Sequence, residues 1–401
     1  MIDSLLYYGY DPSCAESEIP VQIKKSICSQ PNRCDSFNDG VVAFENAMKN
    51  ELYDISNSVE HVVPLSSGLD SRSILAYLIN EAEVESITTV TFGSPGTWDY
   101  DISQQISKSL NVENIALNLE SERFDWSEQS LRKYARSLDC PTRIFEGYVN
   151  SQVNELFDDE YVVWSGFLGG ESMGSHRPEN PCKEWDTACE YFATFNQFTD
   201  LVDQQFDPIA SLPDEPYLPR EVLSYEEQLD FAHRQQCFIR PLIICDPDRY
   251  LTPFLQPEWL RFALNLPPEK RRDRSLFVNI MCDLYPDLFS FPTDMKHGLP
   301  PNANYIRWRA REIRLYISQM LMDAIGLKFT DPGMNYVNFE TMFREDNQLK
   351  TTVQSLTNDF NDRVQWDVQQ IWNEHQRGVD NSNELRAISS TELYLSEASL
   401  S

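Results

Sequence analysis

The sequence predicts an α/β protein with a parallel, doubly wound sheet and a largely α-helical C-terminal half. Three observations support this prediction. Short β-type runs alternate with helical segments through the first 180 residues, long helical stretches broken by proline clusters follow, and the 401 residues contain no repeat or low-complexity tract. Because a strand–helix–strand unit with parallel strands is right-handed, the alternation favours a sheet with helices on both faces.

The individual elements follow in chain order. The expected strands are HVVPL (61–65), SITTVTF (86–92), NIALNL (114–119) and YVVW (161–164). Helical periodicity spans 71–83, 99–110 and 126–138 between them, and 303–325, 349–377 and 384–397 in the second half. We therefore divide the chain into a lead-in of mixed propensity at 1–55 and a module at 56–400. Within the module, 56–180 is the α/β core and 181–400 is mainly helical.

The charge balance excludes some partners. The chain has 63 Asp and Glu against 33 Lys and Arg, a formal net charge of −30 at pH 7. Such a surface repels phosphodiester backbones and anionic membranes, so we expect no nucleic-acid partner and no membrane partner. Only 10 of the 33 basic residues are lysine, and the carboxylates are spread along the whole chain. The pattern suggests adaptation to high salt, as in the acidic proteome of a halophile, because salt screens the self-repulsion.

The N-terminus MIDSLLYYGYDPSCAESEIP has neither a basic region nor a long apolar region, so it does not read as a signal peptide. No run approaches the 18 apolar residues that suggest a membrane span. A cytoplasmic location is therefore expected. The nine cysteines contain no CxxC pair, which indicates reduced thiols and neither a zinc site nor a disulfide framework.

One bend concentrates polar residues between a predicted strand and a predicted helix. It is SSGLDS (66–71), directly after HVVPL. The free N–H groups at a helix N-terminus favour an anion, Gly68 permits close approach, and the serine hydroxyls can donate to phosphate oxygens. Asp70 would repel phosphate unless Mg²⁺ lay between them. On this bend alone, an ordinary helix start capped by Asp70 or Ser71 explains the residues equally well.

This bend resembles the SGGxDS pyrophosphate loop of the asparagine synthetase family of PP-loop ATP pyrophosphatases. Four further segments resemble that family in the same order: TFGSPGTWDYD (91–101), YVVWSGFLGGESMGSH (161–176), TPFLQPEWLRFALNLP (252–267) and FPTDMKHGLP (291–300). The resemblance covers roughly residues 60 to 300. It implies a sheet of the adenine nucleotide alpha hydrolase type, with ATP and Mg²⁺ as cofactors.

The resemblance also implies roles for individual residues. The ATP site would consist of Ser66, Ser67, Gly68, Asp70 and Ser71 for the phosphates, with Leu65, Phe92, Ser165 and Gly166 holding adenosine through their backbones. Asp70 and Glu171 would be the metal ligands. Lys296 and Glu171 would be catalytic, with Lys296 neutralising charge on the α-phosphate or the tetrahedral intermediate. Arg72, in the first helical turn, is expected to be exposed.

The implied reaction is AMP- and pyrophosphate-forming amide synthesis. A substrate carboxylate, aspartate by default in this family, becomes an acyl-adenylate that ammonia or an amine then attacks. Residue 2 is Ile where the glutamine-dependent relatives have a nucleophilic cysteine, and only about 60 residues precede the loop, so this chain is not expected to have glutaminase activity. Nitrogen would come from ammonia, an amine substrate or a separate glutaminase subunit.

Three departures from the family pattern keep alternatives open. Ser67 replaces the second loop glycine, Gly170 stands where the family places an acid that Glu171 would replace from the next position, and Gln256 replaces the aspartate of the "PFLD" element. These changes motivate one alternative, a degenerate nucleotide-binding scaffold or regulatory protein of the same fold. A remote alternative is a serine hydrolase, because Gly170-Glu171-Ser172-Met173-Gly174 matches GxSxG, although no acid partner is evident for a catalytic histidine.

Overall fold

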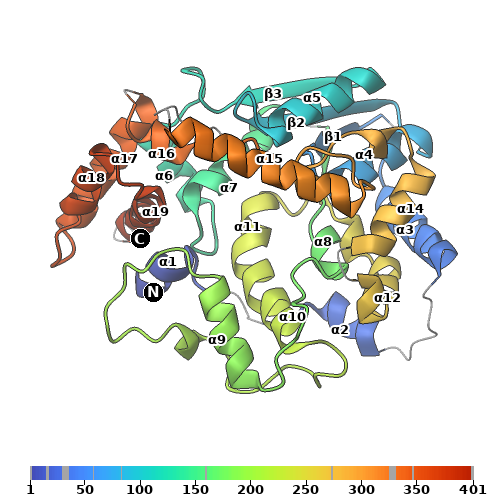
Figure 1. The fold of residues 1–401 in the computed structure, drawn as a ribbon, viewed down its shortest axis with the longest axis horizontal. Helices are drawn as coiled ribbons and strands as arrows, with labels where there is room; N and C mark the ends of the chain where they lie inside the picture. The colour runs from blue at the N-terminus through green and yellow to red at the C-terminus, as the bar shows by residue number, and fades with distance from the viewer. Residues whose placement is uncertain are drawn as a thin grey trace.

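The computed structural model describes residues 2–14, 18–28, 36–56, 58–82, 84–158, 160–271, 274–324, 331–345 and 347–398. Within these ranges the chain forms a five-stranded sheet surrounded by helices (Figure 1). All strand pairs are parallel, in the order β3-β2-β1-β4-β5. The strands are β1 (Glu60–Pro64), β2 (Ser86–Gly93), β3 (Glu113–Asn118), β4 (Tyr161–Trp164) and β5 (Tyr250–Leu251). The predicted fold class is confirmed.

Helices cover both faces of the sheet. Adjacent residues of β1 point to opposite faces, as in any strand: Val63 packs in the core formed with α4 (Leu69–Asn80) and α5 (Trp98–Leu110), and Val62 packs on the other face against η1 (Gln152–Glu155). The segment between β3 and β4 also contains α6 (Glu128–Arg136) and α7 (Ile144–Ser151). The strand order therefore reverses between β1 and β4, and ligands of open α/β sheets bind at such a switch point.

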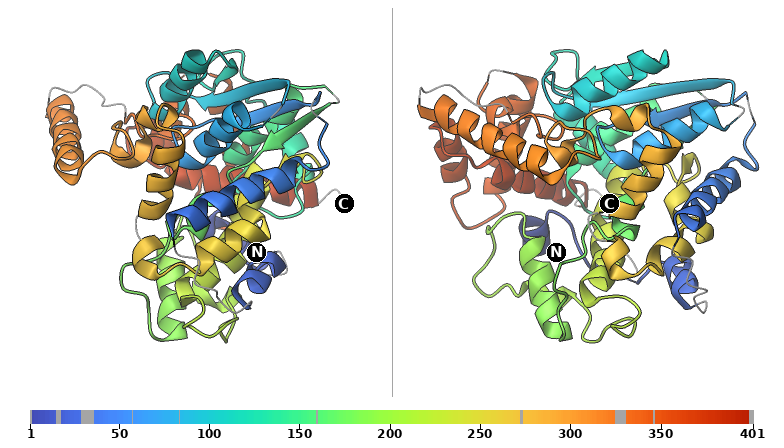
Figure 2. Two further views of the ribbon diagram at one scale, coloured as in Figure 1. Left: turned by 90° about the vertical axis from the view of Figure 1, so that its right-hand side faces the viewer. Right: turned by 45° about the vertical axis from the view of Figure 1, so that its right-hand side comes forward.

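The C-terminal half is mainly helical and packs against both faces. On one side, α12 (Pro257–Leu264) and α14 (Ser275–Leu284) share a core with α4 and the strand β1. On the other side, α17 (Gln348–Asn361) and α19 (Ser382–Ala398) share a core with α6 and α7. Segments far apart in the sequence thus surround the sheet (Figure 2).

The N-terminal lead-in is part of the same body. It forms α1 (Ile2–Tyr8), α2 (Val21–Cys28) and α3 (Phe37–Leu52). The first packs on α19 and the other two on α12. Phe44 of α3 is completely buried among residues of the main core.

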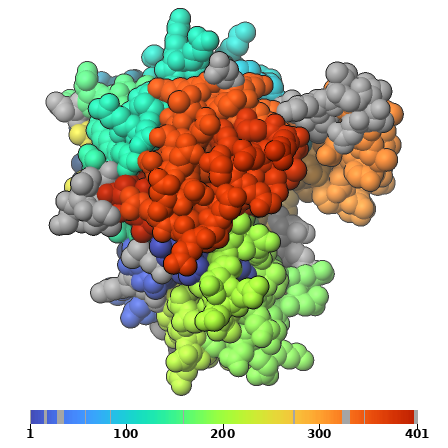
Figure 3. Space-filling model, turned by 90° about the vertical axis from the view of Figure 1, so that its left-hand side faces the viewer, coloured from blue at the N-terminus to red at the C-terminus, as the bar shows by residue number. Residues whose placement is uncertain are grey.

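Helix α15 (Tyr305–Ala324) differs from the others because it projects from the body (Figures 2 and 3). None of its side chains that the structure describes is buried. Its attachment is at its first turns, where the Trp308 ring stacks on His297 with centroids 6.0 Å apart and Arg311 Nε donates to the His297 carbonyl at 3.0 Å.

One helix expected from the sequence is two. The stretch predicted as a single helix over 349–377 ends as α17 at Asn361 and resumes as α18 (Gln369–Gln376). Asn361 Oδ1 accepts the N–H groups of Val368 at 3.0 Å and Gln369 at 3.4 Å, so a side-chain amide replaces helical hydrogen bonds at the break.

The sequence predicted reduced cysteines and no membrane-spanning run. The seven cysteines whose side chains are described are free thiols: Cys14, Cys140, Cys182, Cys189, Cys237, Cys245 and Cys282. In the described ranges, no helix combines the length and apolarity needed to cross a bilayer.

Candidate functional site

The serine-rich bend forms a tight loop between β1 and α4. The Ser66 N–H donates to Ser71 Oγ at 3.3 Å, and the Gly68 N–H donates to Ser66 Oγ at 3.1 Å. Gly68 is the N-cap of α4 and has no side chain to bond the first-turn amides. Neither Asp70 nor Ser71 is the cap, so those amides remain able to bind an anion.

Ser67 points away from the ligand side of the loop. Its N–H and its hydroxyl both donate to Asp99 Oδ1, at 2.9 and 2.6 Å, and its Oγ accepts the N–H of Asp294 at 3.3 Å. Burial raises the pKa of Asp99, which these two hydrogen bonds oppose. The side chain that replaces the family glycine therefore ties the loop to α5 and to the segment at 294, and it does not line the pocket described below.

Arg72 is buried, and the expectation that it is exposed is wrong. Its guanidinium donates to four backbone carbonyls: Ser67 at 2.9 Å, Pro292 at 2.7 Å, Phe291 at 3.0 Å and Leu288 at 3.3 Å. Burial lowers the pKa of Arg72 to about 10, still well above neutral pH. Arg72 is thus a structural cation that fastens the loop to residues 288–292, and it is not positioned to meet phosphate.

A pocket of about 370 Å³ opens at the carboxyl ends of β1, β2, β4 and β5. It is lined by seven of the nine residues that the resemblance assigns to ATP: Ser66, Gly68, Asp70, Ser71, Phe92, Ser165 and Gly166. The two others, Leu65 and Ser67, lie behind this lining. The Leu65 N–H donates to Val90 O at 2.8 Å, and its carbonyl accepts from Thr91 Oγ1 at 3.4 Å, so its backbone is engaged by β2.

An aromatic wall in this pocket was missed by the sequence interpretation. Tyr336 stacks on Phe92 with ring centroids 5.8 Å apart and an interplanar angle of 7°. Asn150 Nδ2 donates to the Tyr336 hydroxyl at 3.1 Å, and both residues line the pocket. Burial raises the pKa of Tyr336, which keeps its hydroxyl neutral. No sequence pattern connects Tyr336 to β2, since 243 positions separate it from the Gly93 that ends the strand.

Asp70, in the first turn of α4, is packed against two glycines and forms an ion pair with an arginine. Gly166 and Gly169 pack against it so closely that added Cβ atoms would lie 2.9 Å from its Cβ and 2.6 Å from its Cγ. Its carboxylate forms an ion pair with Arg274. Burial raises the pKa of Asp70 to about 6; the Arg274 charge opposes this shift, while Glu171 and Asp294 add to it.

The pocket is acidic as well as polar. Asp70, Asp99 and Asp294 all line it, and none of its lining residues that the structure describes is a lysine or an arginine. Asp70 is paired with Arg274, but the carboxylates of Asp99 and Asp294 would still repel a bare phosphate. Carboxylate oxygens are ligands that Mg²⁺ prefers, and Mg²⁺ is commonly held by one or two of them together with substrate phosphates. The residues present therefore fit a metal-bound anion.

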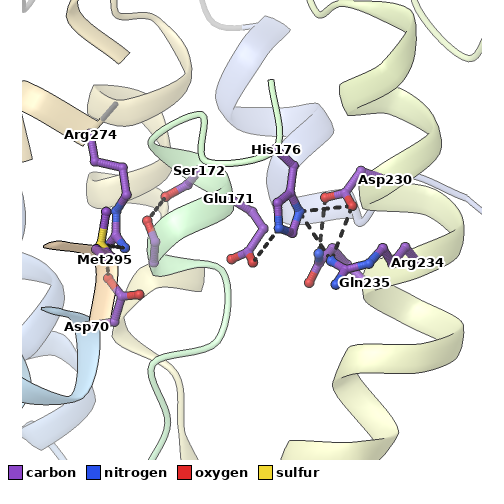
Figure 4. A network of polar contacts seen from close by, with 10 residues as sticks. Asp70, Glu171, Ser172, His176, Asp230, Arg234, Gln235, Arg274 and Met295 are labelled. Atoms are coloured by element: carbon purple, nitrogen blue, oxygen red, sulfur yellow. Dashed lines mark hydrogen bonds and ion pairs between the residues drawn. The ribbon is translucent and has the colours of Figure 1, made fainter. Parts of the chain in front are cut away.

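Glu171 does not join Asp70. It lies in α8 (Gly169–Ser172), and its Oε1 is 3.8 Å from His176 Nε2. Figure 4 shows the two carboxylates directed to different partners, Asp70 to Arg274 and Glu171 to His176. Across the described part of the chain, no group of three or more His, Cys, Asp or Glu side chains is arranged to hold a metal ion.

His176 continues this polar network away from the pocket. Its Nδ1 lies 3.2 Å from Asp230 Oδ1, in the π-helix η3 (Asp230–Ile239), where Arg234 and Gln235 also contact Asp230. Burial alone would lower the pKa of His176, but Asp230 and Glu171 together raise it. The network holds Glu171 in a bridging position between α8 and η3.

Lys296 lies outside the acidic pocket, in cavities that adjoin it. It ends η7 (Asp294–Lys296), whose first residue does line the pocket, and it lines two cavities of about 330 and 790 Å³. Its Nζ lies over the Trp308 ring, 5.5 Å from the centroid. Arg274, the partner of Asp70, lines the larger cavity. The Asp70–Arg274 pair thus separates an acidic pocket from a basic one.

The remaining departures lie away from the acidic pocket. Gln256 Nε2 donates to Glu51 Oε1 of α3 at 2.8 Å. Ser172 is completely buried; its hydroxyl donates to Gly169 O at 3.1 Å and accepts from Trp259 Nε1 at 2.9 Å. A serine hydrolase requires an exposed nucleophile beside a base, and Ser172 has neither property here.

Comparison with known proteins adds no relative from which a role could be transferred. No protein-family model matches the chain, and no curated protein is significantly similar to it in sequence.

Proposed function

We propose that the chain is an ATP-dependent ligase of the asparagine synthetase type. A substrate carboxylate attacks the α-phosphorus of ATP and pyrophosphate leaves; ammonia or an amine then attacks the acyl carbon and displaces AMP, forming an amide. The observation that carries this proposal is the pocket at the switch point of the sheet, which collects the amides of α4, two serine hydroxyls and Asp70 beside an aromatic wall.

Each part of the pocket has a chemical task in this reaction. The α4 amides and the hydroxyls of Ser66 and Ser71 bind the leaving pyrophosphate, and the Phe92–Tyr336 wall packs against the adenine. Asp70 would hold Mg²⁺, together with phosphate oxygens and with Asp99 or Asp294 available nearby. The metal would supply charge neutralisation at the phosphates. Lys296, across the Asp70–Arg274 pair, stabilises negative charge that develops where the acid meets the α-phosphate.

Exchange of labelled pyrophosphate into ATP tests the proposal. The full chain, in molar KCl with Mg²⁺, is offered a panel of carboxylic acids, and acid-dependent exchange is expected for at least one of them. Asp70→Asn should abolish exchange, because it removes the proposed metal ligand. Asp54→Asn, an exposed aspartate with the same charge change, is the matched control and should retain it. Persistent exchange in Asp70→Asn would contradict the assigned role.

A second candidate is a nucleotide-binding scaffold of the same fold. It is favoured by Glu171, which is engaged by His176 and stands apart from Asp70. Both candidates bind Mg·ATP, and turnover separates them. Tight ATP binding with no pyrophosphate exchange across a broad panel supports the scaffold, and exchange with any acid excludes it.

A further inference from the structure

The cavity of about 790 Å³ beside Lys296 is lined by different residues from the acidic pocket. It lies between the loop that follows α8, Arg274, residues 295–296 and the start of α15. Its lining combines basic side chains with apolar ones. Its charged residues are Arg177, Glu179, Arg274 and Lys296.

Three cations line this cavity, which is notable in a chain of net charge −30. Two of them are already neutralised: Arg274 pairs with Asp70 and Arg177 pairs with Glu227. No carboxylate in the described ranges lies within ion-pair distance of Lys296, which contacts the Trp308 ring. The cavity therefore offers one uncompensated positive charge, next to two guanidinium groups that keep the local potential positive.

The remaining lining residues limit which groups a ligand can have besides one carboxylate. Three prolines, Met295, Tyr305 and Trp308 provide apolar surface, and among the lining residues that the structure describes Glu179 is the only acidic one. An aspartate molecule would pair one carboxylate with Lys296, and its second carboxylate would meet Arg177 and Arg274, which are already paired with Glu227 and Asp70. An unpaired carboxylate in such surroundings is costly. A volume of about 790 Å³ also exceeds what so small a ligand fills, and it falls in the range of pockets that hold drug-sized molecules.

We propose that this cavity binds the acid substrate, and that the substrate is a monocarboxylic acid with a bulky apolar or aromatic body. Its carboxylate pairs with Lys296 near the Asp70–Arg274 pair, and its body packs against the prolines and the start of α15. This inference rests on the proposed function and names the substrate class for the same site, in place of the family default, aspartate.

Binding without nucleotide tests the substrate class directly. The probe is 4-fluorophenylacetate, observed by fluorine NMR with the full chain in molar KCl. The acid is expected to bind, the neutral 4-fluorophenylacetamide to bind at least about tenfold more weakly, and L-aspartate at equal concentration not to displace the probe. Equal binding of acid and amide, or displacement by aspartate, would overturn the inference.

Two lysine variants locate the site. Lys296→Ala should weaken binding of the acid about tenfold, because it removes the charge that pairs with the carboxylate. Lys108→Ala removes the same charge from an exposed position on α5 and should change nothing. Unchanged affinity in Lys296→Ala would place the acid elsewhere and refute the assignment.

The exchange assay then separates this inference from the proposed function. Acid binding that depends on Lys296, with no pyrophosphate exchange for any acid, supports the cavity assignment and refutes the ligase. Exchange driven by aspartate, with no binding of the aromatic acid, refutes the substrate class and supports the ligase.

Discussion

Ser67 shows how a side chain in the loop between β1 and α4 can leave the pocket side of that loop open. A glycine at this position would leave Asp99 with fewer partners, whereas the serine donates to it twice. The hydroxyl also accepts the Asp294 N–H, so one side chain joins three segments of the site. From the sequence, Ser67 was only a departure from the family glycine; the structure shows that its side chain bonds Asp99 and Asp294 and does not line the pocket.

Replacing Ser67 with alanine should destabilise the protein without blocking the pocket. The change leaves Asp99, which is half-buried, with one donor fewer, at a cost of about 1–3 kcal/mol in the free energy of unfolding. Denaturant unfolding measures this, and Ser109→Ala, an exposed serine on α5, is the matched control. If the variant unfolded at the same denaturant concentration as the wild type, the Ser67–Asp99 contact would contribute nothing.

The contact between Gln256 and Glu51 predicts that the stability of the protein depends on pH through the Glu51 carboxyl. Burial raises the pKa of Glu51, although hydrogen bonds from Gln256 and from the Thr252 backbone oppose the shift. A carboxyl whose pKa is higher in the folded state contributes stability below its unfolded pKa and loses it as pH rises through the folded value. We therefore expect Glu51→Gln to be more stable than the wild type at pH 8.

This difference should disappear as the pH falls toward 4, where the wild-type carboxyl is protonated in both states. Thermal unfolding of both proteins from pH 4 to pH 8 measures it. Glu85→Gln, at an exposed position, should track the wild type throughout. A stability gain of Glu51→Gln that grew toward acid pH would contradict the sign.

At the scale of elements, two glycines pack closely against Asp70: Gly166 in the loop after β4 and Gly169 at the start of α8. Gly169→Ala would put a Cβ 2.6 Å from the Asp70 Cγ, so the carboxyl or the loop must move. Overpacking of this kind costs about 1–3 kcal/mol, and we expect a similar loss in the affinity for Mg·ATP, measured by calorimetry. Gly170→Ala is the matched control, because the atoms nearest to its Cβ would be the ends of two side chains, Ser175 Oγ at 3.1 Å and Arg274 Nη1 at 3.4 Å. Equal affinities of the two variants would separate Asp70 from nucleotide binding.

The elements that the sequence predicted are those with long, regular patterns. The four predicted strands form β1 to β4 within one or two residues, because alternating or continuous apolar runs mark them clearly. The strand β5 has two residues, too few to show any period. The break between α17 and α18 was missed because it depends on Asn361 folding back on the chain, which helical periodicity does not record.

The residues of the candidate site also differ in whether the sequence could predict them. Residues in loops close to strand ends, such as Ser66 and Ser165, were assigned from the resemblance of those loops to family motifs, and the structure places both in the lining of one pocket. Arg274 and Tyr336 come from the helical half and reach the site only through tertiary packing, so no local pattern marks them. Arg72 was misjudged because a charged residue in a first helical turn is usually exposed, while here four carbonyls from two segments enclose it.

At the scale of the whole molecule, the net charge of −30 opposes compaction. We expect the thermal midpoint to rise by several degrees between 0.1 and 1 M KCl, where the screening length falls from about 10 Å to about 3 Å. The rise should flatten at higher concentration, because little screening remains to be gained. A midpoint that is constant over the first interval would contradict adaptation to salt.

The burial of Arg72 has a consequence for how the protein is made. Its guanidinium needs the carbonyls of residues 288–292, which a ribosome adds more than 200 residues after the loop itself. Tyr336 is added later still. A nascent or prematurely terminated chain that ends before residue 292 therefore carries the serine-rich turn without most of the carbonyls that hold Arg72, and the pocket beside that turn is completed only late in translation.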